Sequence, residues 1–319
     1  MRFSIVPANT NFDFVGRRRF AYPLSVLLIV LSLGGFFVQG LNFGIDFRGG
    51  ILIEIKTDGP ANVAELRNTV GGLNLGEVQV QEFGAADDVL IRVQQQDGAE
   101  AEQLQAINII KDALGDTVVE YRRTEFVGPT VGAELISSAI WAVLLAIGAI
   151  LVYIWFRFEW QFGVGAVIAL THDVLTTIGL FAITQLEFNL ATVAAILTIA
   201  GYSINDTVVI YDRVREELRR YKKLDMPALL NLAANRTLSR TFMTSVTTLI
   251  ALVALAVFGG TIIRDFALAM IWGVVIGTYS SVFVAVPVLL ALNLSRESLS
   301  AGLDEDGEGD GTTDAAPEQ

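Results

Sequence analysis

One carboxylate lies within an otherwise apolar stretch of the chain. Asp206 belongs to "GYSINDTVVIYDRVREELRRYKK" (201–223), about two helical turns, or roughly 10 Å, before a cluster of arginines. An aspartate near the middle of a membrane helix costs roughly 2.5–3.5 kcal/mol, and ionisable groups at that depth usually mark an ion or proton path. The sequence therefore predicts a proton-binding function for Asp206. The alternative is a neutral, protonated side chain that hydrogen-bonds a neighbouring helix.

Helical spacing places further polar residues near Asp206. By the i, i+3, i+4 rule, Tyr202, Ser203, Asp206 and Arg213 share one stripe of the helix, and Asn205 is the sequence neighbour of the aspartate. We expect Tyr202, Ser203, Asn205 and Arg213 to support the site.

A second polar pair, His172 and Asp173, lies in the preceding apolar run ("LTHDVL"). Sequence neighbours on a helix point about 100° apart, so the two side chains need not line the same cavity. Imidazole titrates nearest neutrality and is suited to passing a proton; the alternative is a neutral His172 that donates to a carbonyl. Asp173 cannot be explained by apolar packing, because its side chain is a carboxylate. Both residues are predicted to belong to the proton path.

Arg240 opens the next apolar run, in "NRTLSRTFMTSVTTL". Because a guanidinium stays charged at any accessible pH, it can only move or change partner. An Asp206–Arg240 pair would break when the aspartate is protonated and re-form on release. The alternative is an arginine that anchors the helix end at the membrane surface.

Composition indicates that these residues lie in a lipid bilayer. Hydrophobic residues make up 53% of the 319-residue chain and charged residues 18%, which is more apolar surface than a soluble domain can bury. The first run follows Arg17–Arg19, as in a signal peptide, but its apolar core is too long and no cleavage pattern follows. We therefore predict six transmembrane helices, each long enough to cross about 30 Å of hydrocarbon, at 20–41, 135–156, 160–186, 188–212, 241–263 and 266–292.

The charge distribution predicts the orientation. Residues 42–134 hold 16 acidic and 7 basic residues, whereas basic residues cluster in 1–19 and in a predicted cytoplasmic loop, 213–240. By the positive-inside rule both termini are cytoplasmic and 42–134 lies outside. An acidic outside region argues against nucleic-acid binding. No cysteine is present and there is one histidine, so we expect no disulfide, no histidine-rich metal site and no cofactor.

The outside region 42–134 has the pattern of a small folded domain. Strand-like alternation at 50–56, 77–83, 88–94 and 117–127 is interrupted by helical spacing at 61–70 and 98–114, with "GAAD" (84–87) as a hairpin turn. The order β-α-β-β-α-β is typical of a ferredoxin-like α+β domain. No nucleophile–base pair or phosphate-binding loop occurs in it, so we expect no enzyme activity.

The last span repeats a small residue every four positions: Gly273, Gly277, Ser281 and Ala285. Such a face lets another helix approach closely, as ordinary packing or as a moving interface, of which packing is the commoner. The acidic, glycine-rich tail 296–319 is predicted to be disordered.

Several motifs resemble the SecD/SecF family of the bacterial protein-secretion system, over about residues 12–293. They are "LNFGIDFRGG", "VGPTVG", "GYSINDTVVIYDRVRE", "NRTLSRTFMTS" and "FGG". The resemblance implies an inner-membrane half-unit of the resistance–nodulation–division architecture. It also implies a SecD-like partner, export driven by the proton-motive force, and contact with the SecYEG channel, YajC, YidC and the translocating preprotein. Asp206 and Arg240 match the family's functional aspartate and arginine, and His172–Asp173 its "HD" pair.

Two other functions fit parts of the pattern. A small-molecule exporter of the same superfamily would carry a large outside domain after a later span as well, and this chain has one such domain of about 90 residues. A scaffold for a SecD-like subunit, in which Asp206 never titrates, would tolerate Asp206→Asn.

Overall fold

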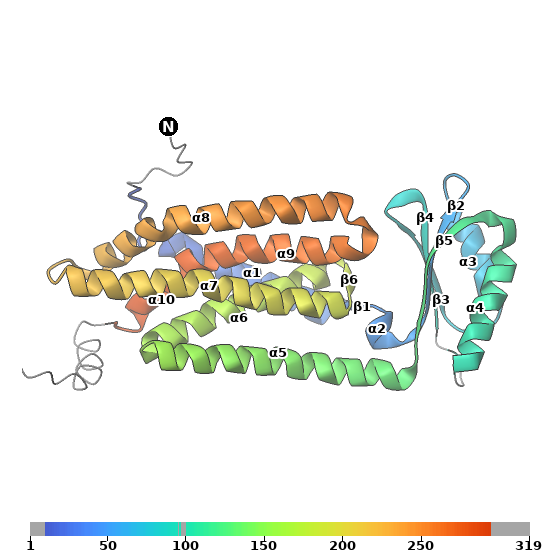
Figure 1. The fold of residues 1–319 in the computed structure, drawn as a ribbon, viewed down its shortest axis with the longest axis horizontal. Helices are drawn as coiled ribbons and strands as arrows, with labels where there is room; N and C mark the ends of the chain where they lie inside the picture. Colours follow the sequence, from blue (N-terminus) through green and yellow to red (C-terminus); the bar gives the residue numbers. More distant parts are fainter. Residues whose placement is uncertain (1–9, 95, 97–99, 295–319) are drawn as a thin grey trace, which may run out of the picture.

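Six helices of the computed structural model are long and apolar enough to cross a membrane; the structure describes residues 10–94, 96 and 100–294. They run side by side in one bundle, and an α/β domain lies at one end of it (Figure 1). The helices are α1 (Arg18–Gln39), α5 (Pro129–Arg157), α6 (Trp160–Thr184), α7 (Leu190–Arg220), α8 (Met226–Phe258) and α9 (Gly260–Ser280). Residues 1–9 of the predicted cytoplasmic N-terminus (1–19) and the whole predicted disordered tail (296–319) lie outside the described residues.

The sixth helix does not end at Ser280. A single π-helical turn (Ser281–Ala285) continues it into α10 (Val286–Ala291). Pro287, in the first turn of α10, has no N–H to donate to the preceding turn, and single π turns occur frequently at functional sites.

The segment 213–240, expected as a cytoplasmic loop, is mostly helical. α7 continues to Arg220 and α8 begins at Met226, so the connection is residues 221–225. Charged residues marked this segment as lying outside the hydrocarbon, but they are good helix formers, and the buried residues Leu218, Leu229 and Leu230 pack the two extensions together. The connection lies at the end of the bundle opposite the α/β domain (Figure 1).

The α/β domain contains a four-stranded antiparallel sheet in the order β3-β4-β2-β5. Its elements follow the predicted β-α-β-β-α-β order. They are β2 (Gly50–Thr57), α3 (Val63–Gly71), β3 (Val78–Phe83), β4 (Ala85–Val93), α4 (Glu100–Leu114) and β5 (Val118–Val127). The β3–β4 turn is tighter than "GAAD", because Gly84 has a φ of 94° and Phe83 already pairs with Ala85.

Both faces of β2 are covered, which explains why nearly all of its side chains are buried. Ile51, Ile53 and Ile55 belong to the apolar core shared with α3 and α4, and each is 0% exposed. On the opposite face Leu52 packs with Ile45 of the short helix α2 (Ile45–Arg48). The sheet therefore has α3 and α4 on one face and α2, in the segment that follows α1, on the other.

A second, two-stranded sheet joins the domain to the bundle. β1 (Asn42–Phe43), just after α1, pairs in parallel with β6 (Glu187–Phe188), which connects α6 to α7. Sequence analysis did not anticipate this pairing, because two-residue strands carry no periodicity.

Candidate functional site

Asp206 lies on α7 and is 3% exposed. The helix begins with a capping box in which Asn189 accepts from the Thr192 N–H and the Thr192 hydroxyl accepts from the Asn189 N–H. Asp206 Oδ2 has no hydrogen-bond partner in the part of the chain that the structure describes. A buried carboxylate oxygen without a donor is costly, which makes this atom the natural place for a proton.

Arg240 of α8 is the charge that acts electrostatically on Asp206, although the two form no direct ion pair within the described residues. Arg240 is exposed, and the hydroxyl of the next residue, Thr241, is buried with no hydrogen-bond partner among the described residues. Asp206 and Arg240 are therefore close enough to attract each other but do not form the predicted ion pair within the described residues. A proton on Asp206 would remove that attraction, and its release would restore it.

Asp173 is the centre of a hydrogen-bond cluster that joins three helices. Its Oδ2 accepts from the hydroxyls of Ser203 on α7 (2.5 Å) and Ser280 on α9 (2.7 Å). Its Oδ1 lies 2.9 Å from Nδ1 of His172 on the same helix. Asp173 is 0% exposed, so the cluster replaces the water that a carboxylate needs. Asp173 is thus fully partnered, in contrast to Asp206.

His172 lies next to Tyr279 of α9, which in turn contacts a fourth helix, α1. Its ring centroid lies 6.0 Å from that of Tyr279, whose hydroxyl donates to the Ala21 carbonyl of α1 at 2.8 Å. His172 Nε2 is buried with no partner in the described chain. The adjacent side chains His172 and Asp173 therefore contact each other and share one buried polar region.

The residues expected to support Asp206 separate into two groups. Ser203 belongs to the Asp173 cluster, and Tyr202 is partly buried, its hydroxyl having no partner in the portion of the chain that the structure describes. Asn205 is exposed, because it points about 100° away from Asp206 around the helix. Arg213 turns away to the carboxylate of Glu217, with Nε 2.8 Å from Oε1. The structure therefore does not bring Asn205 or Arg213 to Asp206.

The small residues of α9 lie against α7. A Cβ added to Gly273 would come within 2.2 Å of Ile199, and one added to Gly277 within 3.1 Å of Ser203 Cβ. Ser281 hydrogen-bonds Thr207 of α7 at 2.9 Å. Ser280, one residue before Ser281, donates to Asp173 on α6.

Sequence analysis missed Ser280 and Glu217. Ser280 adjoins the small-residue stripe, and that adjacency was the available signal. Glu217 was hidden in a charged run, yet it is 0% exposed and forms ion pairs with Arg213 of its own helix and Arg236 of α8. Its ion pair with Arg236 links the extensions of α7 and α8, between Asp206 and the α7–α8 connection.

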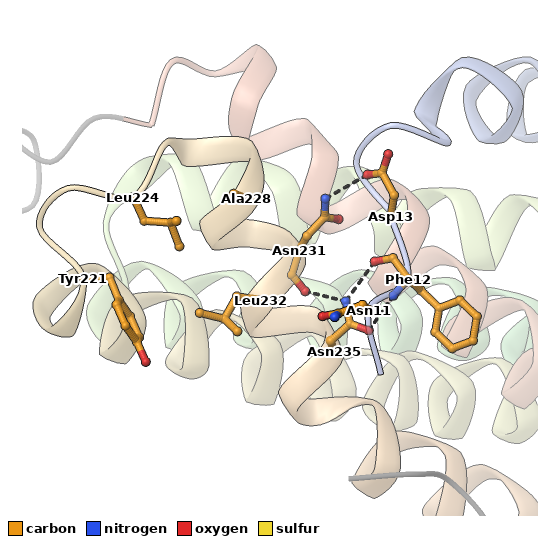
Figure 2. A pocket seen from close by; sticks show the side chains of 9 residues that line it. All are labelled: Asn11, Phe12, Asp13, Tyr221, Leu224, Ala228, Asn231, Leu232 and Asn235. Carbon is orange, nitrogen blue, oxygen red and sulfur yellow. Dashed lines mark hydrogen bonds between the residues drawn. The ribbon is translucent and has the colours of Figure 1, made fainter. Parts of the chain in front are cut away.

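A pocket of about 490 Å³ lies at the same end of the bundle, between the α7–α8 connection and residues 11–13 (Figure 2). Asn235 pairs with the Phe12 backbone through both its amide atoms, at 2.8 and 2.9 Å, and Asn231 donates to Asp13 at 2.8 Å. Bonds from the Gly16 N–H and from Asn231 hold the pKa of Asp13 below its ordinary value. The pocket contains none of the membrane carboxylates described above.

No group of three or more histidine, cysteine, aspartate or glutamate side chains suited to a metal ion occurs in the described residues. Within the described residues the site contains a buried carboxylate with one unpartnered oxygen (Asp206), a positive charge within electrostatic reach (Arg240) and a polar cluster between helices (around Asp173). A buried ionisable group in such surroundings is a candidate for binding and releasing a proton.

Comparisons with known proteins identify the family. The family described as "Protein export membrane protein SecD/SecF, C-terminal" matches residues 108–295, and the "SecD/SecF GG Motif" matches residues 34–61. A protein translocase subunit SecF from Magnetococcus marinus is 50% identical over 297 residues, which cover 92% of this chain and 96% of that one. A SecF subunit from Rickettsia bellii is 45% identical over 89% of this chain and 94% of its own length.

Solved structures agree with this result. The crystal structure of SecDF, a translocon-associated membrane protein from Thermus thermophilus, matches with a TM-score of 0.81 and 35% identity, covering 91% of this chain. SecDF in a super-membrane-facing form matches with a TM-score of 0.67 and 34% identity. The chain spans 40% and 41% of those two SecDF chains.

Fold and site define a multi-pass membrane protein with a buried polar centre in its helical bundle. The chain belongs to the SecD/SecF family of protein export membrane proteins, and its curated relatives are SecF subunits. This membership establishes a role in protein export.

Proposed function

We propose that the chain is the SecF-like half of a SecD–SecF complex that uses the proton-motive force to promote protein export. The observation that supports this most is Asp206, a buried carboxylate on a membrane helix next to a helix that carries Arg240. One of the Asp206 oxygens has no hydrogen-bond partner in residues 10–94, 96 and 100–294. Arg240 keeps its charge, so Asp206 is the member of the pair that switches.

In this mechanism a proton from the outside neutralises Asp206 and removes its attraction for Arg240. α7 and α8 then separate at that level, and release of the proton to the cytoplasm draws them together again. One charge crossing the membrane is worth about 2.3 kcal/mol per 100 mV, more than the roughly 0–1 kcal/mol of a solvent-exposed ion pair. The Asp173 cluster, with His172 beside it, holds α6, α7 and α9 together and supplies polar groups along the path.

The proposed partner is a SecD-like subunit. The SecDF chains that this chain matches are more than twice its length, which is consistent with a second half of similar size. Asn205, exposed on α7 one residue from Asp206, lies on a face that such a half would cover. We further propose contact with the SecYEG channel, YajC, YidC and the translocating preprotein.

The proposed location is the bacterial inner membrane with both termini in the cytoplasm. The basic ends of α7 and α8 support this orientation, since they lie opposite the acidic α/β domain (Figure 1). That domain would be periplasmic, and its element order and sheet order are consistent with a ferredoxin-like fold. We propose that it holds or moves the exported chain and that the protein is not an enzyme.

Two alternatives remain as outcomes of the test. A small-molecule exporter is disfavoured because the loops after α5 lack a second outside domain in the described chain. A scaffold in which Asp206 does not titrate predicts that the charge of Asp206 is dispensable.

The test is gradient-stimulated export of a model preprotein into vesicles that carry the complex with Asp206→Asn. Asp212→Asn is the matched control, because Asp212 lies on the same helix and its ion pair with Arg157 is about half exposed. We expect Asp206→Asn to assemble normally and to lose the gradient-stimulated part of export, while Asp212→Asn retains it. Unchanged export with Asp206→Asn would contradict the proposal.

A further inference from the structure

The α/β domain meets the bundle at a junction formed by β1, α2 and β6. Besides the two-stranded pairing, the Gly44 N–H donates to the Phe188 carbonyl at 2.9 Å, and Asn42 donates to the Gln185 carbonyl at 3.0 Å. A Cβ on Gly44 would lie 2.5 Å from a carboxylate oxygen of Glu187, so a larger residue there would displace the Glu187 side chain.

The junction is fixed directly to the end of α7. Asp46 Oδ2 accepts from the N–H of Leu190, the first residue of that helix, at 2.9 Å. A carboxylate there satisfies an N–H that has no partner within the helix and interacts favourably with the helix dipole. Leu190 is sixteen residues before Asp206 on one continuous helix, so the two lie about 24 Å apart along a rigid element.

The sheet of the domain is fixed to the same place by charge. Arg92 of β4 pairs with Glu187 of β6 and also donates to Asn42 of β1 at 3.4 Å. The Arg92 and Glu187 side chains are 12% and 14% exposed, so this pair is largely shielded from solvent. Arg123 of β5 lies within electrostatic reach of both Glu187 and Asp46. Arg92 thus pairs directly with Glu187, while Arg123, whose direct partner is Glu125, adds a positive charge near Glu187 and Asp46.

We propose that this junction is the mechanical link between the proton-binding helix and the outside domain, with Asp46, Arg92 and Glu187 as its positioning residues. A shift or tilt of α7 displaces β6 and Asp46 directly, since only Asn189 separates β6 from the helix. β1 and Arg92 then carry that displacement into the sheet. α9 also contacts this region: Arg264 lies over the Phe83 ring at 5.9 Å, and Asp265 accepts from the Glu187 backbone N–H. The inference rests on the proposed function and specifies how its motion reaches the domain.

The test uses charge reversal at the shielded pair. Arg92→Glu, Glu187→Arg and the double swap are compared in assembled complexes, with Lys56→Glu as the control. Lys56 belongs to the same sheet, and its pair with Asp87 at 3.4 Å remains within the domain. Each variant is assayed for assembly and for gradient-stimulated export.

A second readout follows the domain itself. Because the chain has no cysteine, spin labels can be placed uniquely at Gln105→Cys on α4 and Ile250→Cys on α8, both exposed. The distance between the labels is measured with and without an imposed proton gradient. A purely structural role for Arg92 would leave the gradient response of this distance intact.

We expect each single reversal to lower gradient-stimulated export about fivefold or more and to abolish the distance response. The double swap should restore both, and Lys56→Glu should behave as wild type. Single reversals that keep the wild-type distance response would overturn the link while leaving the proposed function standing. A wild-type complex whose export ignores the gradient would overturn the proposed function and the link with it.

Discussion

Asp173 of α6 accepts hydrogen bonds from side chains of α7 and α9, and replacing it with alanine removes this shared acceptor. The Ser203 and Ser280 hydroxyls and His172 Nδ1 would each lose a partner at 2.5–2.9 Å. None of the three can turn to solvent, because each is at most 2% exposed. We therefore expect Asp173→Ala to loosen the packing of α6, α7 and α9 as a unit.

The magnitude follows from the number of bonds. Hydrogen bonds between membrane helices average about 0.6 kcal/mol in double-mutant cycles, with values up to about 1.7. Three bonds of about that size, two between helices and one to His172 within α6, give a loss of about 2 kcal/mol in the free energy of unfolding for Asp173→Ala. Asp173→Asn keeps one acceptor oxygen and should lose about half as much. Ser203→Ala and Ser280→Ala should each lose about 0.6 kcal/mol.

The assay is reversible unfolding of the purified chain in bicelles, with double-mutant cycles between Asp173→Ala and each serine variant. We expect a coupling of about 0.6 kcal/mol for each serine, because each hydroxyl bonds to the same carboxylate. A stability of Asp173→Ala within error of wild type would refute the reasoning. So would strictly additive losses, since they would show that the hydroxyls do not depend on Asp173.

Three further predictions concern other parts of the molecule. Gly273→Ala places a Cβ within 2.2 Å of Ile199 and should lower the free energy of unfolding by about 1–3 kcal/mol, whereas Gly148→Ala, with nothing within 4 Å, should not; bicelle unfolding distinguishes them. Arg240→Gln should abolish gradient-stimulated export with normal assembly while Arg240→Lys retains part of it, and equal activity of both variants would contradict the role of the charge. The lowered pKa of Asp13 means that its contacts with Gly16 and Asn231 are complete above the ordinary value of 3.8 and weaken as the pH falls below it. Amide exchange at Gly16 should therefore accelerate, beyond its intrinsic pH dependence, only below that pH, and no change in protection there would contradict this.

The helices and strands were predictable because the surrounding medium, hydrocarbon or water, dictates where apolar residues must recur along the chain. Runs of about twenty apolar residues must be helices in hydrocarbon, and alternation such as that of Ile51, Ile53 and Ile55 marks a strand with one face toward a core. Asp206 was identifiable for the same reason, since a carboxylate in an apolar run is costly enough to require an explanation.

The partners of each side chain were not predictable. Periodicity fixes which residues share a face of a helix, but not which faces meet. Ser280 bonds Asp173 from 107 residues away, and only the packing of α9 against α6 and α7 reveals it. Glu217 looked solvated because its neighbours in sequence are charged, yet α8 continues past the membrane level and buries it. The helical extensions around 213–240 were missed because charge marks the end of the hydrocarbon and not the end of a helix.

The central claim is that Asp206 exchanges a proton with the gradient, and proton uptake tests it most directly. Assembled complexes in vesicles, supplied with a channel-engaged preprotein and an inward gradient, are monitored with an entrapped pH dye. We expect wild type and Asp212→Asn to take up protons during translocation and Asp206→Asn to take up none above the lipid background. Uptake by Asp206→Asn at the wild-type rate would contradict the claim and leave Asp206 as a packed, non-titrating side chain.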